Sequence, residues 1–145
     1  MLDNYRDLID ELLGTPAVLR TLSGDAGPEA LPAGVVSLIG ELRDRDLEVQ
    51  ARLQTMLHER NPYLRALAEA PQPMAGAEDA AAVLRGFDSA RGELVSLLMN
   101  LTLKDWERTA THEVEGEITL AEEVERHVEF DEDRVARAQA AAMTG

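Results

Sequence analysis

Apolar residues recur at spacings of three, four and seven through almost the whole chain, and this periodicity constrains the fold more than any other feature. Such spacing places apolar side chains along one face of an α-helix. Aromatic residues make up only 3% of the chain, whereas Ala, Leu, Glu and Arg, which favour helices, are abundant. The one candidate strand, Glu117–Leu120, is short and leads directly into a helix start. The pattern therefore predicts an all-α protein with no sheet beyond an isolated bridge.

Four long amphipathic segments follow one another along the chain. They span residues 2–22, 33–60, 79–101 and 119–142, and the stretches between them that we predict to be loops or irregular are 23–32, 70–77 and 110–118. Gly14-Thr15-Pro16 interrupts the first segment: either Thr15 caps a second helix that begins at Pro16, or Pro16 lies within one longer helix. Four such helices, with long connections between the first and second and between the third and fourth, predict a four-helix bundle that forms one domain over residues 1–145.

Two pairs of residues carry the spacing of helix caps. Thr102 and Asp105 predict a short capped turn that ends at Trp106, and Thr119 and Glu122 predict a capping box at the start of the last helix. Because an indole that follows a capped turn usually packs inward, we expect Trp106 in the core or anchoring a loop.

The charge balance excludes several classes of function. Acidic residues number 28 against 14 basic ones, which gives a net charge of -14. A chain this acidic repels nucleic-acid phosphates and anionic lipids, so we predict no nucleic-acid partner and no membrane binding. No apolar run approaches the roughly 18 residues that span a bilayer, and residues 1–13 lack the basic start of a signal peptide. We therefore expect a cytoplasmic protein, and the absence of Cys excludes disulfides and thiolate metal sites.

The chain has three histidines, and none of them follows a glutamate by three positions, so the pattern of di-iron bundles is absent. His127 and Asp131 are four residues apart and share a helix face, where they could bind a divalent metal with a third ligand from another helix. The alternative is a surface ion pair between Asp131 and Arg134 beside a partly exposed His127. His58 is expected at the surface near a helix end, and His112 is expected to bond backbone groups of its loop.

Several stretches, taken in order, carry a family resemblance. Thr111-His112-Glu-Val-Glu-Gly116 is followed by Ile118-Thr119-Leu120 and then by a helix that holds Phe130-Asp131-Glu-Asp-Arg134. This arrangement resembles the C-terminal signature of the DinB-like family, also called the DinB/YfiT-like metalloenzymes. The resemblance implies a four-helix bundle, often a homodimer, that holds a divalent metal through three histidines. Some branches of the family are thiol-dependent transferases or isomerases.

The chain departs from the family at all three ligand positions. Counting from Gly116, the two family histidines of the last helix fall on Phe130 and Arg134, and the family histidine of the second helix falls on Glu41. Phenylalanine has no donor atom and arginine stays protonated in proteins. We therefore expect the metal triad to be lost, with no cofactor. If the family geometry is kept, Glu41 and Arg134 should face each other as an ion pair. If the pair is buried, removal of either side chain should cost about 3 kcal/mol, because it leaves the other charge unpaired.

Three functional hypotheses follow from these observations. The leading one is a non-catalytic binding or interaction protein that binds a partner, a second copy of itself, or a small apolar ligand in the remaining cleft, and a homodimer is the expected assembly. The alternative is a divalent-metal-dependent transferase or hydrolase that uses zinc or nickel at a shifted site of Glu41, His127 and Asp131. The third is a scaffold or regulatory partner with no ligand. Metal analysis of the purified protein separates the first hypothesis from the second.

Overall fold

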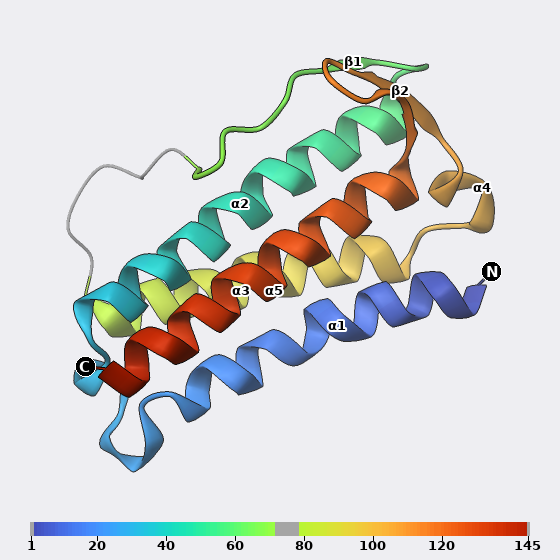
Figure 1. The fold of residues 1–145 in the computed structure, drawn as a ribbon. Coiled ribbons are helices and arrows are strands. Elements are labelled where there is room, and N and C mark those ends of the chain that lie inside the picture. The colour runs from blue at the N-terminus through green and yellow to red at the C-terminus, as the bar shows by residue number, and fades with distance from the viewer. Residues whose placement is uncertain (1, 72–78, 145) are drawn as a thin grey trace.

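The four-helix bundle predicted from the sequence is confirmed. The computed structural model describes residues 2–71 and 79–144, and their long helices are α1 (Leu2–Thr21), α2 (Ala33–His58), α3 (Ala80–Met99) and α5 (Leu120–Thr144). They lie side by side as an elongated bundle (Figure 1), in which α2 packs against α3 and α5, and α1 packs against the same two helices. No helix within this part of the chain has both the length and the apolar character to cross a membrane.

Short elements fill the connections between the long helices. They are the 3₁₀ turns η1 (Gly24–Ala26) and η2 (Pro28–Ala30), the strand β1 (Tyr63–Leu64), the helix α4 (Leu103–Trp106), and the strands β2 (Thr109–His112) and β3 (Gly116–Thr119). The connection from α2 to α3 is also long and carries β1, which the sequence did not indicate. The predicted loop at 70–77 lies largely outside the described residues.

The small sheet contradicts the prediction that no sheet would form. β2 and β3 pair as an antiparallel hairpin in which Ala110 lies opposite Ile118, and β1 joins β2 in parallel. Gly116 closes the hairpin with a φ of 77°, which favours glycine. Strands of two to four residues are too short to show an alternating pattern. Ala110 and Ile118 are both buried in the core, so packing with the helices stabilises the hairpin.

Both predicted capping boxes are present. The Thr102 hydroxyl accepts the backbone N–H of Asp105 and the Asp105 carboxylate accepts that of Thr102. Thr119 and Glu122 exchange the same two bonds, at 3.0 and 3.2 Å, where β3 leads into α5. Trp106 is 2% exposed and belongs to the core, as expected.

The apolar core consists of two clusters, one toward each end of the bundle. The cluster nearer the sheet includes Leu12, Leu53, Leu94 and Val124, and the other includes Leu19, Ile39, Phe87 and Ala138. Between these levels each long helix contributes a buried polar residue, and the set is Thr15, Asp46, Arg91, His127 and Asp131. The core therefore contains a polar layer at mid-bundle, to which we refer as the Arg91 layer.

Arg91 of α3 binds all three other long helices. Its guanidinium donates to both carboxylate oxygens of Asp46 on α2, at 2.8 and 3.0 Å, and to Asp131 on α5, at 2.6 Å. Its Nη1 also donates to the backbone carbonyl of Leu12 on α1, at 2.7 Å. That carbonyl is available because the residue four positions later is Pro16, which has no N–H. α1 runs through Pro16 as a single helix, so the longer helix is the correct alternative.

Removal of the Arg91 guanidinium should strongly destabilise the fold. Arg91→Met leaves two buried carboxylates without their cation, and we expect a loss of about 3–5 kcal/mol in the free energy of unfolding. Arg20→Met is the control, because Arg20 pairs with Asp88 at the surface and its side chain is 60% exposed; that change should cost less than about 1 kcal/mol. Urea unfolding followed by circular dichroism measures both, and similar losses would contradict a central role for Arg91.

Candidate functional site

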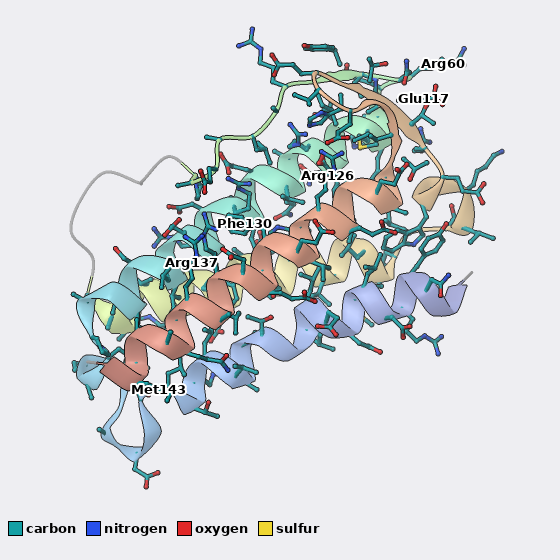
Figure 2. All side chains as sticks on the ribbon, in the orientation of Figure 1. Arg60, Glu117, Arg126, Phe130, Arg137 and Met143 are labelled. Atoms are coloured by element: carbon teal, nitrogen blue, oxygen red, sulfur yellow. The ribbon has the colours of Figure 1, made fainter. Side chains whose placement is uncertain are left out.

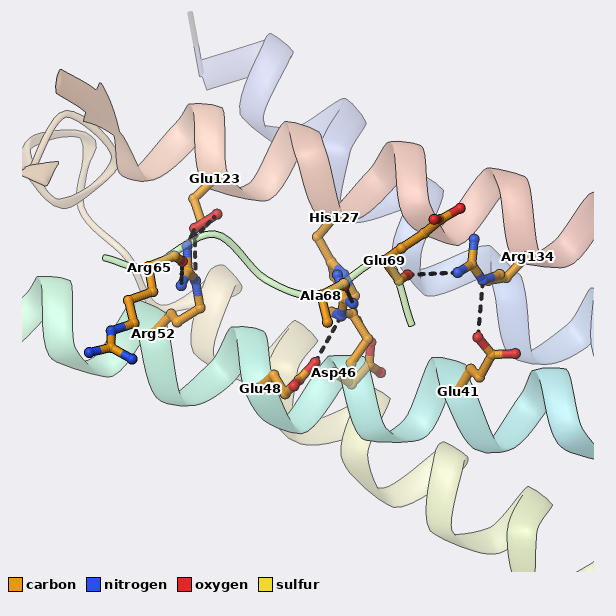
Figure 3. A network of polar contacts seen from close by, with 11 residues as sticks. Glu41, Asp46, Glu48, Arg52, Arg65, Ala68, Glu69, Glu123, His127 and Arg134 are labelled. Atoms are coloured by element: carbon orange, nitrogen blue, oxygen red, sulfur yellow. Dashed lines mark hydrogen bonds and ion pairs between the residues drawn. The ribbon is translucent and has the colours of Figure 1, made fainter. Parts of the chain in front are cut away.

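The three residues at the family's ligand positions do lie together. Arg134 Nε on α5 is 3.4 Å from Glu41 Oε1 on α2, so the predicted ion pair is present (Figure 3). The guanidinium carbons of Arg134 and Arg45 are each 4.3 Å from the centroid of the Phe130 ring. These groups do not fit a metal, because Phe130 has no donor atom and two guanidiniums beside it would repel a divalent cation.

The shifted set of Glu41, His127 and Asp131 is not brought together. Glu41 faces Arg134, His127 Nε2 lies 2.7 Å from Asp46 Oδ1, and Asp131 accepts from Arg91 and Thr15. Across residues 2–71 and 79–144, no three His, Cys, Asp or Glu side chains form a group that could hold a metal ion.

The alternative of a surface ion pair is also wrong. His127 is 3% exposed and Asp131 is 4% exposed, and Asp131 pairs with Arg91 rather than with Arg134. The spacing of residues along one helix shows which of them share a face. The spacing does not show whether this face points into the bundle, because the orientation of a helix depends on the neighbouring helices.

The two other histidines behave as expected. His58 ends α2 and is exposed. His112 is buried at the end of β2, where its Nδ1 accepts the backbone N–H groups of Val114 and Glu115, at 3.1 and 3.2 Å. It therefore orders the turn of the hairpin.

Residues 65–69, which we call the strap, lie over the groove between α2 and α5. Three arginines bind backbone carbonyls of the strap: Arg52 donates to Arg65 at 2.7 Å, Arg45 donates to Ala68, and Arg134 donates to Glu69 at 2.8 Å. Each arginine also lies against a carboxylate, and the respective partners are Glu123, Glu48 and Glu41 (Figure 3). The contact of Arg45 Nε with Glu48 is 2.8 Å long but lies outside hydrogen-bond geometry.

A cavity of about 280 Å³ lies between α2, α5, the strap and the hairpin. Its charged lining consists of three arginines and two glutamates, namely Arg45, Arg52, Arg126, Glu115 and Glu123. His127 and Phe130 of α5 also line it, whereas Val49 and Leu67 supply apolar surface. Arg126 lies toward the hairpin end of α5, and Arg137 lies nearer the C-terminal end of the same helix (Figure 2).

Burial and neighbouring charges shift two pKa values around this cavity. Burial lowers the pKa of Arg45, nearby Arg134 and Arg52 lower it further, and Glu48 opposes them. For Asp46, burial would raise the pKa, but the hydrogen bond from His127 and the charge of Arg91 outweigh it, and the net pKa is below the ordinary value. Asp46 is therefore an ionised acceptor in the folded protein.

That ionised carboxylate fixes the bonding of the His127 ring. Asp46 has no proton to give, so Nε2 of His127 must be the donor in their 2.7 Å contact. The other ring nitrogen, Nδ1, is buried and has no hydrogen-bond partner in the part of the chain that the structure describes. An unpartnered buried nitrogen on a residue that lines a cavity is a candidate position for a ligand.

Neither the motifs nor the family resemblance marks Asp46 or Arg45 as a site residue, although the sequence carries a signal for them. Residues 43–46 read Arg-Asp-Arg-Asp in the middle of the apolar stripe of α2. Four consecutive residues point in all directions around a helix, so at least one charged side chain had to face the core. All four are less than 9% exposed.

The Glu41–Arg134 pair should respond unequally to mutation, contrary to the similar costs expected from the sequence. The Arg134 side chain is 6% exposed and also contacts Asp133, Glu69 and Phe130, whereas the Glu41 side chain is 29% exposed. Arg134→Ala should cost about 3 kcal/mol, and Glu41→Ala less than about 1 kcal/mol. Urea unfolding of the two variants tests this difference, and equal losses would show that the pair acts as an isolated buried unit.

The lowered pKa of Asp46 predicts a loss of stability in acid. A carboxyl group whose pKa is lower in the folded than in the unfolded state stabilises the fold fully above its unfolded pKa, near the ordinary 3.8. That contribution is lost as the pH falls through the folded pKa, so the free energy of unfolding should decrease from about pH 5 downward. Asp46→Asn should be less stable at neutral pH and should show a shallower acid dependence. Asp25→Asn, at an exposed position in η1, is the control and should follow the unmodified protein.

The comparisons with known proteins find a similar structure but no similar sequence. No protein-family model matches the sequence, and no curated protein matches it. Among solved structures, the chain is similar to YfiT from Bacillus subtilis, described as a probable metal-dependent hydrolase with an unusual four-helix bundle topology. The TM-score is 0.75 at 17% sequence identity, over 99% of this chain and 89% of YfiT. The chain therefore has the DinB/YfiT-like four-helix bundle fold.

Proposed function

We propose that the protein binds a small anionic molecule in the cavity between α2 and α5, without a metal. The observation that carries this proposal is the lining of the cavity, which gathers three arginines in a chain whose net charge is -14. Each of these arginines has a glutamate partner, but Glu115, the partner of Arg126, is 51% exposed and can give way to another carboxylate. Guanidinium groups in a partly closed site bind carboxylates and other oxyanions.

Arg126 is the residue best placed to bind the anion directly. Its side chain is 35% exposed, and its ion pair with Glu115 is 3.3 Å long at the rim of the cavity. Such exposed pairs contribute little, so Arg126 can exchange Glu115 for a ligand at low cost. Arg45 and Arg52 are held by the strap and by glutamates, so their guanidinium groups form a fixed polar wall of the cavity.

The charged lining changes the class of ligand that we expect. The sequence suggested a small apolar ligand, but burial of an apolar molecule beside three guanidinium groups and two carboxylates would leave those groups poorly solvated. The volume of about 280 Å³ lies at the lower end of the range for small-molecule sites. A compact carboxylate fits both the size and the charge.

We do not extend the metal-dependent activity ascribed to YfiT to this chain, because its residues do not provide the metal site. At the positions that the family resemblance assigns to metal ligands, this chain has an ion pair and a phenylalanine between Arg45 and Arg134, and these groups offer no ligand set. The alternative of a zinc or nickel site at Glu41, His127 and Asp131 has no support, because the three side chains bind separate partners.

Titration with small carboxylates tests the proposal. We expect acetate or benzoate to cause saturable shifts in the backbone amide resonances around the cavity. Arg126→Gln should weaken binding about tenfold, which corresponds to the loss of about 1.4 kcal/mol. Arg137→Gln is the matched control, because Arg137 is also on α5, exposed and paired with a carboxylate, but lies away from the cavity. Absence of saturable shifts, or equal weakening in both variants, would refute this function.

A further inference from the structure

We infer that His127, oriented by Asp46, is a general base in this cavity and gives the protein a metal-independent hydrolase activity toward small carboxylic esters. The inference rests on the proposed function for the place where the ligand binds, and it goes beyond binding to a reaction.

The His127 ring is held in one orientation. Its Nε2 donates to Asp46 at 2.7 Å, and the two side chains are 1% and 0% exposed. Asp46 is in turn fixed by two hydrogen bonds from Arg91. A carboxylate that binds one ring nitrogen sets the tautomer, so in the neutral ring the lone pair lies on Nδ1. Asp46 is therefore a positioning residue for His127.

The free nitrogen belongs to His127, a residue that lines the cavity. Nδ1 has no partner within residues 2–71 and 79–144, and the same cavity is lined by Arg45 and Arg126. An oriented imidazole beside cationic groups meets the requirements for acyl transfer to water, in which a base accepts a proton while negative charge develops on an oxygen nearby.

The reaction balances without a metal. A water molecule attacks the ester carbonyl carbon and its proton passes to His127 Nδ1, while the carbonyl oxygen becomes an oxyanion that Arg45 and Arg126 stabilise electrostatically. The bond from the carbonyl carbon to the alcohol oxygen then breaks, and the departing oxygen takes the proton from the imidazolium ring. The products are a carboxylic acid, which ionises, and an alcohol. The carboxylate product belongs to the anion class that the cavity is proposed to bind.

Hydrolysis of 4-nitrophenyl acetate in the presence of EDTA tests the activity. His127→Gln keeps an amide N–H for Asp46 but removes the basic nitrogen, so kcat/KM should fall about 100-fold. His58→Gln is the matched control, because His58 is exposed and distant from the cavity, and its kcat/KM should be unchanged. Three results would overturn the inference. They are hydrolysis by the unmodified protein that is no faster than in buffer, activity that His127→Gln retains, and a loss of activity in His58→Gln as large as that in His127→Gln.

The positioning role of Asp46 has its own readout. Asp46→Asn should lower kcat while KM for 4-nitrophenyl acetate stays the same, because only the orientation and basicity of His127 change. Partial unfolding would instead lower the concentration of active protein, which is measured independently from the helical circular dichroism signal. A kcat per folded molecule equal to that of the unmodified protein would exclude the role.

Chemical modification of the unmodified chain gives a second test that needs no variant. Diethyl pyrocarbonate acylates an unprotonated imidazole nitrogen and releases carbon dioxide and ethanol, and mass spectrometry locates the modified histidine. We expect modification of His127 that benzoate slows. If His127 stays unmodified while exposed His58 reacts fully, its free nitrogen is closed to substrates and the inference fails.

The two proposals can fail separately. If carboxylates bind in a way that depends on Arg126 but ester hydrolysis does not depend on His127, the binding function is supported and the hydrolase activity is refuted. Hydrolysis that depends on His127, without carboxylate binding, would support the general base and overturn the anion site.

Discussion

The guanidinium of Arg91 holds the four long helices together at mid-bundle. It binds carboxylates on α2 and α5 and the carbonyl that Pro16 leaves free on α1. Apolar packing is not directional, so the two apolar clusters alone would tolerate a shift of one helix along another. Buried charges must keep their partners, and a shift would leave Asp46 or Asp131 unpaired. The Arg91 layer therefore fixes the register in which the helices meet.

The same alignment of the helices also brings together the residues of the candidate site. Asp46 accepts from Arg91 on one helix and from His127 on another, so the interaction that stabilises the core also orients the imidazole beside the cavity. Farther along α2 and α5, Glu41 and Arg134 meet where the family resemblance places metal ligands. Two opposite charges attract each other directly, whereas neutral imidazole ligands are connected only through the metal ion that they share. An ion pair can thus connect the helices without a metal.

A shared fold does not transfer chemistry when the reactive groups differ. The likeness to YfiT extends over nearly the whole chain, but the sequence identity is 17%. The positions that the family resemblance assigns to metal ligands hold Glu41, Phe130 and Arg134. The proposed anion binding and general-base hydrolysis depend instead on the groups that line the cavity. Both proposals fit a bundle in which the strap covers the groove between α2 and α5 and is bound there by three arginines of these helices.

The long helices can be predicted from the sequence, because their periodicity and caps such as Thr119 with Glu122 arise from residues close together in the chain. The Glu41–Arg134 pair can be predicted as well, through the family resemblance. The hairpin over 109–119 and the burial of His127 cannot, because the short strands of the hairpin and the imidazole ring depend on packing against other helices. A polar side chain is buried or exposed according to partners on other helices: Asp46, the partner of His127, is 81 residues away in the chain. Local patterns carry no information about such distant partners.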